Sequence, residues 1–156
     1  MSDHLGPAAA LVRLSFLVQA IYSEVAEKHE LTVAQAQLIC VVKERARGMS
    51  ELAAMLRLEK SSLSGLVDRA EQRGLLSRRA EGEDRRATML VLTEVGLPLA
   101  EAFYAEVTER LTLVVGALPP RERARFAELA SRLVLSAHIP PVFGEMNEDS
   151  VTGGGP

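Results

Sequence analysis

Hydrophobic residues recur every three or four positions in several stretches of the chain, which is the spacing of one face of an α-helix. One such stretch covers residues 8–28, and a second is expected over residues 32–47, with Thr32 as a good N-cap. Two further stretches, 52–56 and 63–70, are separated by a short gap with a break at Leu58-Glu59-Lys60. A gap this short predicts two helices held at an angle, as in a helix-turn-helix.

The pattern changes after Gly74, a residue that can take the left-handed conformation at the end of a helix. Residues 75–79 and 87–93 are rich in strand-forming side chains and are joined by the polar run 80–86. This pattern predicts a hairpin that carries several arginines. A helix-turn-helix followed by such a hairpin is a winged helix.

Helical spacing returns after the hairpin, and the next helix is expected to start near Leu97, because a proline at 98 is tolerated only in a first turn. Pro119 and Pro120 should end it, with Pro120 as the first residue of a last helix that stops before Pro140. The expected organisation is therefore an N-terminal helix (1–31), a winged helix-turn-helix (32–96), C-terminal helices (97–140) and a flexible tail (141–156).

The two ends of the chain carry long apolar stripes, over residues 11–25 and 97–118. A small domain can hardly cover both stripes, and identical chains most often meet about a two-fold axis. We therefore expect a homodimer whose interface is formed by the helices at both ends of the chain. The alternative is that the two stripes pack on each other within one chain.

The central third of the chain resembles the MarR family of bacterial regulators. The match is carried by Ser61-Ser62-Leu63-Ser64, Leu66-Val67-Asp68-Arg69, Arg73-Gly74-Leu75-Leu76, Arg79, Asp84-Arg85-Arg86 and Leu90-Val91-Leu92-Thr93-Glu94-Val95-Gly96. The D-x-R run followed by L-T-x-x-G is its most specific part. The resemblance implies a mainly α fold (an α+β winged helix) whose terminal helices form a dimer. It also implies a sequence-specific regulator, commonly a repressor that a small aromatic or phenolic ligand releases from a pseudo-palindromic operator in double-stranded DNA.

Composition fits one cytoplasmic domain. The chain has 156 residues, of which 47% are hydrophobic, and one cysteine, Cys40, as expected in a reducing compartment. No secretory signal is evident, and no apolar run approaches the roughly 20 residues of a membrane span, so no membrane partner is expected. The net charge is −3, yet residues 57–86 hold eight basic against six acidic side chains. This local excess favours phosphate binding on the elements expected to read DNA.

The second helix of a winged helix lies in the major groove and reads base edges with residues near its N-terminus. The residues so placed are Lys60, Ser61, Ser62, Ser64 and Arg69. The two serines could instead only cap the helix, and Arg69 with its acidic neighbour could form a solvated face. At Gly65 the chain departs from the family, in which a larger residue, often arginine, is common, and this removes one direct reader.

Arginines of the hairpin are the stronger candidates. Arg85 and Arg86 at its tip can enter the narrow, negative minor groove. By resemblance, Arg86 is the arginine of D-x-R and Asp84 braces it. The phosphate contacts are expected from Arg78 and Arg79 on the strand and Arg57 in the turn, unless these arginines are merely solvated.

An effector pocket is expected where polar residues border the apolar stripes, at Ser15, Tyr22 and Gln37. The peroxide-sensing branch of the family has a cysteine where this chain has Ser15. Cys40 lies in an apolar run and should be buried and inert, with redox sensing as the alternative.

Three scattered histidines have no metal-ligand spacing, and no nucleophile elbow, phosphate loop or carboxylate pair is evident. We therefore expect neither an enzyme nor a bound cofactor or metal. The competing non-catalytic hypothesis is a winged helix that binds protein instead of DNA, as an antirepressor.

Overall fold

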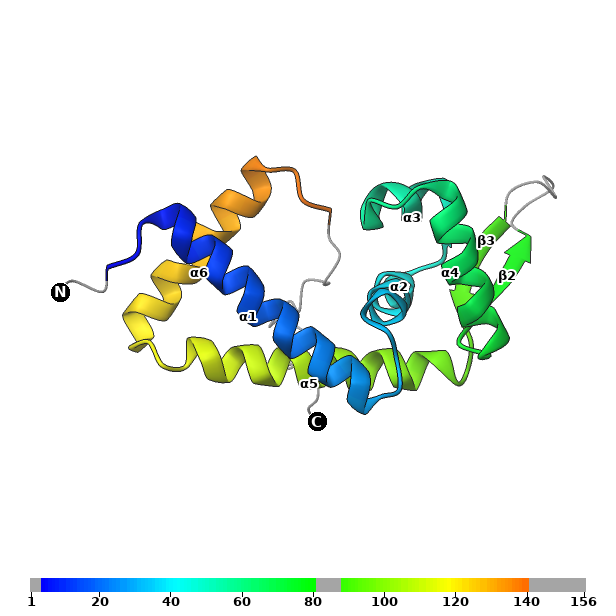
Figure 1. The fold of residues 1–156 in the computed structure, drawn as a ribbon, viewed down its shortest axis with the longest axis horizontal. Helices are drawn as coiled ribbons and strands as arrows, with labels where there is room; N and C mark the ends of the chain where they lie inside the picture. Colours follow the sequence, from blue (N-terminus) through cyan, green and yellow to red (C-terminus); the bar gives the residue numbers. More distant parts are fainter. Residues whose placement is uncertain (1–3, 81–87, 141–156) are drawn as a thin grey trace, which may run out of the picture.

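The chain forms a long helical base that carries a compact head at one end (Figure 1). The computed structural model describes residues 4–80 and 88–140. Its helices are α1 (Pro7–Lys28), α2 (Val33–Glu44), α3 (Met49–Leu56), α4 (Lys60–Gln72), α5 (Gly96–Val115) and α6 (Pro120–Ser136), and its strands are β1 (Arg47–Gly48), β2 (Leu76–Ala80) and β3 (Thr88–Leu92).

The head is a winged helix-turn-helix, as predicted. Helices α3 and α4 are followed by strands β2 and β3, which pair antiparallel from Leu76 opposite Leu92 to Ala80 opposite Thr88. Several local signals are confirmed. Thr32 caps α2 through a capping box with Gln35, and Pro120 is the first residue of α6.

The sequence pattern was wrong about the end of α2. This helix stops at Glu44, and Arg45 is already extended, with φ −163° and ψ 164°. Arg47 and Gly48 instead form β1, an edge strand that pairs with β3 in the sheet order β1-β3-β2. This strand, which the sequence did not predict, holds the start of α3 next to the hairpin by pairing with β3.

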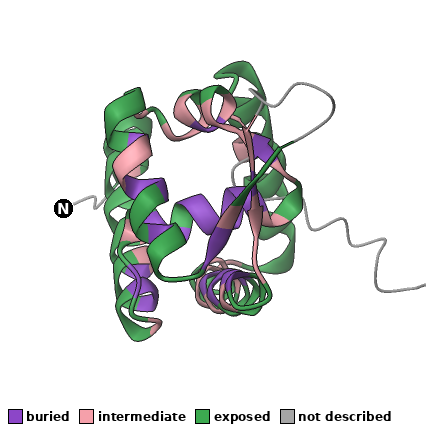
Figure 2. Ribbon diagram, turned by 90° about the vertical axis from the view of Figure 1, so that its right-hand side faces the viewer, coloured by how far each residue is buried: buried purple, intermediate pink, exposed green. Residues whose placement is uncertain are grey.

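Two hydrophobic clusters share α2 as their common wall. One face of α2 packs Ala36 and Ile39 between α1 and α5, against Phe103. The other face packs Leu38 and Val41 into the head, between α3, α4 and the strands. Figure 2 shows the buried residues concentrated at this junction. The head is therefore built on the helical base, with α2 buried on both sides.

The turn after α4 and the start of α5 meet in backbone contact. Gly74 has φ +70°, the left-handed conformation that its sequence position predicts. Its carbonyl accepts a hydrogen bond from the Thr93 hydroxyl, which itself accepts one from the Gly96 amide at 3.0 Å. A Cβ at Gly96 would lie 1.8 Å from the Leu75 carbonyl oxygen, so only glycine fits there. This contact gives a structural reason for the L-T-x-x-G run.

The two ends of the chain are covered only in part. Ile21 and Val25 of α1 pack on α5 within the same chain, as the intrachain alternative proposed. The N-terminal half of α1 remains exposed, with Phe16 at 68%. Helix α6 buries none of its residues, and Leu133 and Val134 are 55% and 47% exposed. The intrachain packing thus accounts for one half of each stripe and leaves the outer halves uncovered.

Helix α1 also corrects the expectation that no segment approaches the length of a membrane span. By length and hydropathy alone its 22 residues would suffice to cross one. Its C-terminal half, however, packs on α5 and carries Glu24 and Lys28, which pair with Arg110 and Glu106 of that helix. The exposed apolar surface is therefore confined to the N-terminal half, which is too short for a span.

Candidate nucleic-acid interface

Helix α4 presents one polar face to solvent at the surface of the head. Its other face is buried through Leu63, Leu66, Val67 and Ala70. The exposed face carries Lys60, Ser61, Ser62, Asp68 and Arg69, while Ser64 and Gly65 are half-buried. All the positions predicted on this helix therefore lie on or beside its outer face, except that Ser64 points partly inward.

The N-terminus of α4 is open. Its N-cap is Glu59, whose side chain makes no capping hydrogen bond, and Ser61 and Ser62 stand inside the first turn. Neither serine is therefore the N-cap of α4, which was the alternative role considered for them. The free amide groups of a first helical turn favour an anion, and Lys60 is the first residue of this turn.

Arg78, expected to meet phosphates, instead links the hairpin to α4. Its Nη2 atom lies 2.6 Å from Oδ1 of Asp68, and its Nε atom 3.7 Å from Oε2 of Glu71. The pair fixes β2 against α4 and neutralises an acid on the outer face. Arg79, the next residue of β2, is exposed and makes no ion pair within the described part of the chain. Asp84, Arg85 and Arg86 lie outside the described residues.

Arg73, at the C-cap of α4, joins this helix to the corner between α1 and α2. Its Nη1 atom donates to the Glu30 carbonyl oxygen at 2.7 Å and to Oε1 of Gln35 at 3.0 Å. Glu30 has φ +56°, which turns that carbonyl toward α4. Sequence reasoning missed this contact, because its partners are 38 or more positions away.

A buried arginine positions α3 and was also missed. Arg47 is only 4% exposed, and its Nε donates to the Val41 carbonyl oxygen at 2.8 Å. Its Nη atoms reach Glu51 at 2.7 Å and Glu44 at 3.1 Å. Desolvation opposes ionisation of Glu51, but hydrogen bonds from Arg45 and Arg47 outweigh it and lower the pKa of that carboxyl. The sequence did offer one signal for this site, because acidic residues stand three positions before Arg47 and four positions after it.

A cavity of about 180 Å³ lies between α1, α2 and the end of α3. Tyr22 and Gln37, two of the predicted pocket residues, line it together with Cys40 and Arg57. Arg57 is the left-handed C-cap of α3, at φ +53°, and so stands in the turn that leads to α4. Ser15, the third, lies on the exposed half of α1, where its hydroxyl donates to the Val12 carbonyl.

The wall of this cavity is apolar and tightly packed. The Tyr22 ring packs edge to face on Phe103, with centroids 5.7 Å apart, and burial raises the pKa of its hydroxyl. Cys40 is a free, buried cysteine, as predicted. Burial raises the pKa of its thiol to about 12, although the Lys43 ammonium opposes the shift.

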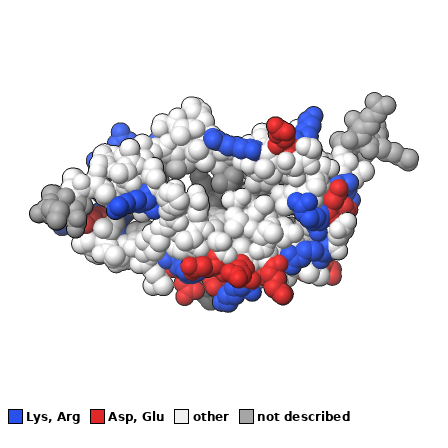
Figure 3. Space-filling view, viewed as in Figure 1, with Lys and Arg blue, Asp and Glu red and all other residues white. Residues whose placement is uncertain are grey.

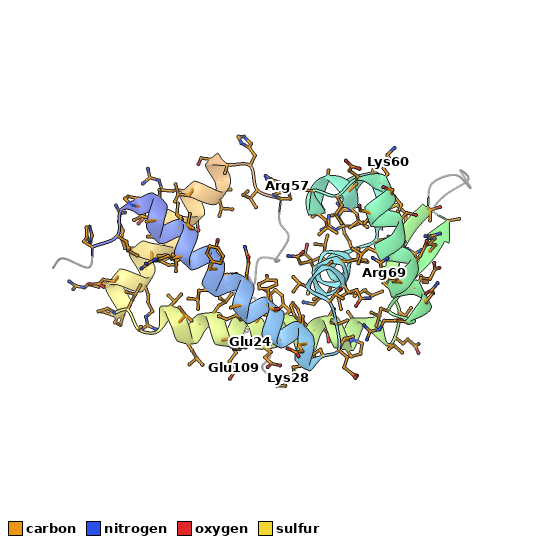
Figure 4. The ribbon with its side chains drawn as sticks, viewed as in Figure 1. Glu24, Lys28, Arg57, Lys60, Arg69 and Glu109 are labelled. Atoms are coloured by element: carbon orange, nitrogen blue, oxygen red, sulfur yellow. The ribbon has the colours of Figure 1, made fainter. Side chains whose placement is uncertain are left out.

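Charges are unevenly distributed over the molecule. In Figure 3 many acidic side chains, with basic ones among them, lie along the edge formed by α1 and α5, and basic side chains mixed with acids lie over the head. In Figure 4, Glu24, Lys28 and Glu109 are labelled on the edge formed by α1 and α5. Arg57, Lys60 and Arg69 are labelled on the head. Among the described residues no cluster of three His, Cys, Asp or Glu side chains could hold a metal ion.

Comparison with known proteins points to one family. The sequence profile of the MarR family matches residues 29–87, which include α2, α3, α4 and β2. The HTH-type transcriptional regulator PecS of Dickeya dadantii is 25% identical over 127 residues, which cover 79% of this chain and 76% of PecS.

Solved structures share the fold over most of the chain. NadR in complex with 4-hydroxyphenylacetate superposes with a TM-score of 0.68 at 24% identity, covering 85% of this chain and 95% of NadR. A Staphylococcus aureus MepR mutant bound to an oligodeoxyribonucleotide gives a TM-score of 0.59 at 18% identity, and the match covers 86% of this chain and 99% of the MepR chain. The profile match, the curated relative and the shared architecture agree with the residue pattern. Residues 29–87 of the chain match the MarR family, the relative PecS is a transcriptional regulator, and the winged-helix fold is shared with the solved structures over most of the chain.

Proposed function

We propose that the protein is a cytoplasmic, homodimeric repressor that binds a pseudo-palindromic operator and leaves it when a small aromatic ligand binds. The outer face of α4 is the observation that carries the proposal. It combines an uncapped N-terminus, two exposed serines and free basic groups beside a hairpin. A helix of this kind fits the major groove, while a wing reaches the adjacent minor groove.

The exposed ends of the chain support the dimer. Helix α6 buries nothing in its own chain, and its Phe126, Leu129, Leu133 and Val134 form one exposed apolar stripe. The N-terminal half of α1 adds Leu14 and Phe16 nearby (Figure 1). A second copy would cover both surfaces, and its head would present a second α4 about one helical turn of DNA away.

The cavity supports a ligand of one aromatic ring. Its apolar wall suits a ring, and the Arg57 guanidinium offers a partner for a carboxylate. NadR, a protein of the same fold, is known in complex with such a compound, 4-hydroxyphenylacetate. Since Arg57 stands in the turn between α3 and α4, a ligand that holds it would shift α4 and weaken DNA binding.

Selection from a pool of random duplexes tests the proposal. The full-length protein should enrich a two-fold symmetric motif, and its affinity for that motif should fall with salt by about 0.9 log units per log unit for each neutralised phosphate. Addition of 4-hydroxyphenylacetate as a probe, or of related aromatic acids, should release the motif. A protein that enriches no sequence and shows no salt-dependent binding would instead support the antirepressor hypothesis.

A further inference from the structure

Helix α4 has a notch on its outer face that another side chain of the same helix fills. The notch is Gly65, where the helix lacks a side chain. A Cβ built there would lie 3.2 Å from Nη1 and 4.0 Å from Cζ of Arg69. The guanidinium of Arg69 therefore reaches back one helical turn and lies over the Gly65 backbone.

The positions next to the notch make this place accessible to DNA. Ser61, Gly65 and Arg69 are spaced by four residues, so they follow one another along a single row of the helix. This row lies opposite the buried residues Leu63 and Val67. Because the two residues that precede Arg69 in the row are small, its guanidinium is the bulkiest group there.

Neighbouring arginines of the head are bound to the scaffold. Arg73 donates to Glu30 and Gln35, and Arg78 pairs with Asp68 and Glu71. The Arg69 guanidinium, in contrast, makes no hydrogen bond or ion pair within residues 4–80 and 88–140. Asp68, which precedes Arg69 in the sequence, is already paired with Arg78. Among the described residues Arg69 thus offers a free guanidinium on the exposed face of α4.

We propose that Arg69, laid across Gly65, is the specificity-determining residue of the recognition helix and reads a guanine in each half-site. A guanidinium matches O6 and N7 of guanine with two parallel hydrogen bonds, which no other base edge in the major groove accepts in the same way. Gly65 is required for this arrangement, because a side chain at position 65 would occupy the place of the Arg69 guanidinium. The inference rests on the proposed DNA binding and names the base that it recognises.

Three variants separate base reading from simple charge attraction. Arg69→Lys keeps the charge but loses the planar fork. Gly65→Ala keeps Arg69 and adds a methyl group 3.2 Å from its Nη1 atom. Arg79→Lys, on the exposed part of β2, makes the same chemical change outside α4 and is the matched control. Circular dichroism and thermal melting of each variant verify that the fold and the dimer are retained.

The readout is the affinity of each protein for the selected motif and for all its single-base changes. Wild-type protein should lose at least tenfold in affinity when one guanine per half-site is replaced, whereas Arg69→Lys should lose most of that preference and keep the others. Gly65→Ala should weaken the preference at the same position. Arg79→Lys should shift all sequences by one common factor.

Two results would overturn the inference in distinguishable ways. If Arg69→Lys binds the same motif with the same preference at every position, Arg69 does not read a base, although the protein still binds DNA. If wild-type protein selects no motif at all, the proposed function fails as well, and the inference falls with it.

Discussion

The Nη1 atom of Arg73 lies 3.0 Å from Oε1 of Gln35, so the C-cap residue of α4 is hydrogen-bonded to α2, the helix at the centre of the molecule. The same Gln35 oxygen accepts the Thr32 amide in the capping box of α2. One buried amide group thus connects the start of α2 with the end of α4. We expect this connection to help orient α4 relative to α2.

Arg73→Met should therefore weaken operator binding about five- to tenfold, and lower the free energy of unfolding by about 1 kcal/mol, because two hydrogen bonds at the end of α4 are lost. Fluorescence anisotropy and urea denaturation measure the two effects. A double-mutant cycle with Gln35→Met should show that the two substitutions are not additive. Strict additivity would mean that the contact contributes nothing to the orientation of α4.

The apolar stripe of α6 should control assembly. Leu133→Glu places a charge in the middle of the stripe and should shift the protein toward monomers, with at least a tenfold weaker dimer. Leu135→Glu is the same chemical change at a position that is 76% exposed and lies on the other side of the helix, and it should leave the dimer intact. Sedimentation equilibrium measures both. Equal behaviour of the two variants would show that α6 is not part of the interface.

Cys40 should react slowly as long as the protein is folded. With a pKa of about 12 only about 1 in 10,000 of the thiols is ionised at pH 8, and the thiolate is the reactive form. Alkylation by iodoacetamide at pH 8 should therefore be at least about 100-fold slower in the native protein than in urea. Rapid native alkylation that also releases DNA would instead favour redox sensing.

The same shift has a consequence for stability. An unfolded thiol ionises near pH 9, but the folded one stays protonated up to about pH 12. The unfolded state loses its proton first, so the contribution of Cys40 to the unfolding free energy is complete below pH 9 and falls between pH 9 and 12. Cys40→Ala should reduce the decline of stability over this range.

The wing is predicted from the sequence alone to contribute to binding. Arg86→Ala should weaken operator binding by about 1 kcal/mol or more without unfolding the dimer, as judged by gel shift and circular dichroism. The salt dependence of binding should also become shallower if the arginine neutralises a phosphate. Unchanged affinity would remove the wing tip from the mechanism.

Gly96 should not tolerate even one methyl group. Gly96→Ala would bring a Cβ to within 1.8 Å of the Leu75 carbonyl oxygen, so the start of α5 must move, and we expect a loss of more than about 2 kcal/mol of stability. Gly48→Ala is the matched control, since its Cβ would meet Met89 at an ordinary 3.7 Å. Thermal melting of both variants compares them. A fully stable Gly96→Ala protein would contradict the described contact.

The sequence was sufficient for features with a local cause. The capping box at Thr32, the left-handed Gly74 and the helix start at Pro120 depend on neighbours within a few residues, and each is confirmed. Strand β1 was missed because two residues carry no periodicity, and its existence depends on pairing with β3. The roles of single arginines also required the fold.

Arg78 illustrates that second limit. As one of several basic residues in a hairpin it was predicted to meet phosphates, yet its distance to Asp68 decides that it holds the hairpin on α4. Arg69 differs from it only in what surrounds it: a glycine one turn earlier, and an acidic neighbour that is already paired. Such differences become visible only when both elements are placed in space.

Residues 45–80, which form most of the described head, hold eight Lys or Arg side chains against four Asp or Glu, so basic charge is in excess on this part of the molecule. Near a polyanion this local excess favours an approach with the head forward, so a chain of net charge −3 can still meet DNA in a productive orientation. Rate constants of encounter should consequently decrease with ionic strength, whereas the net charge alone would make them increase, because salt screens the repulsion between like charges.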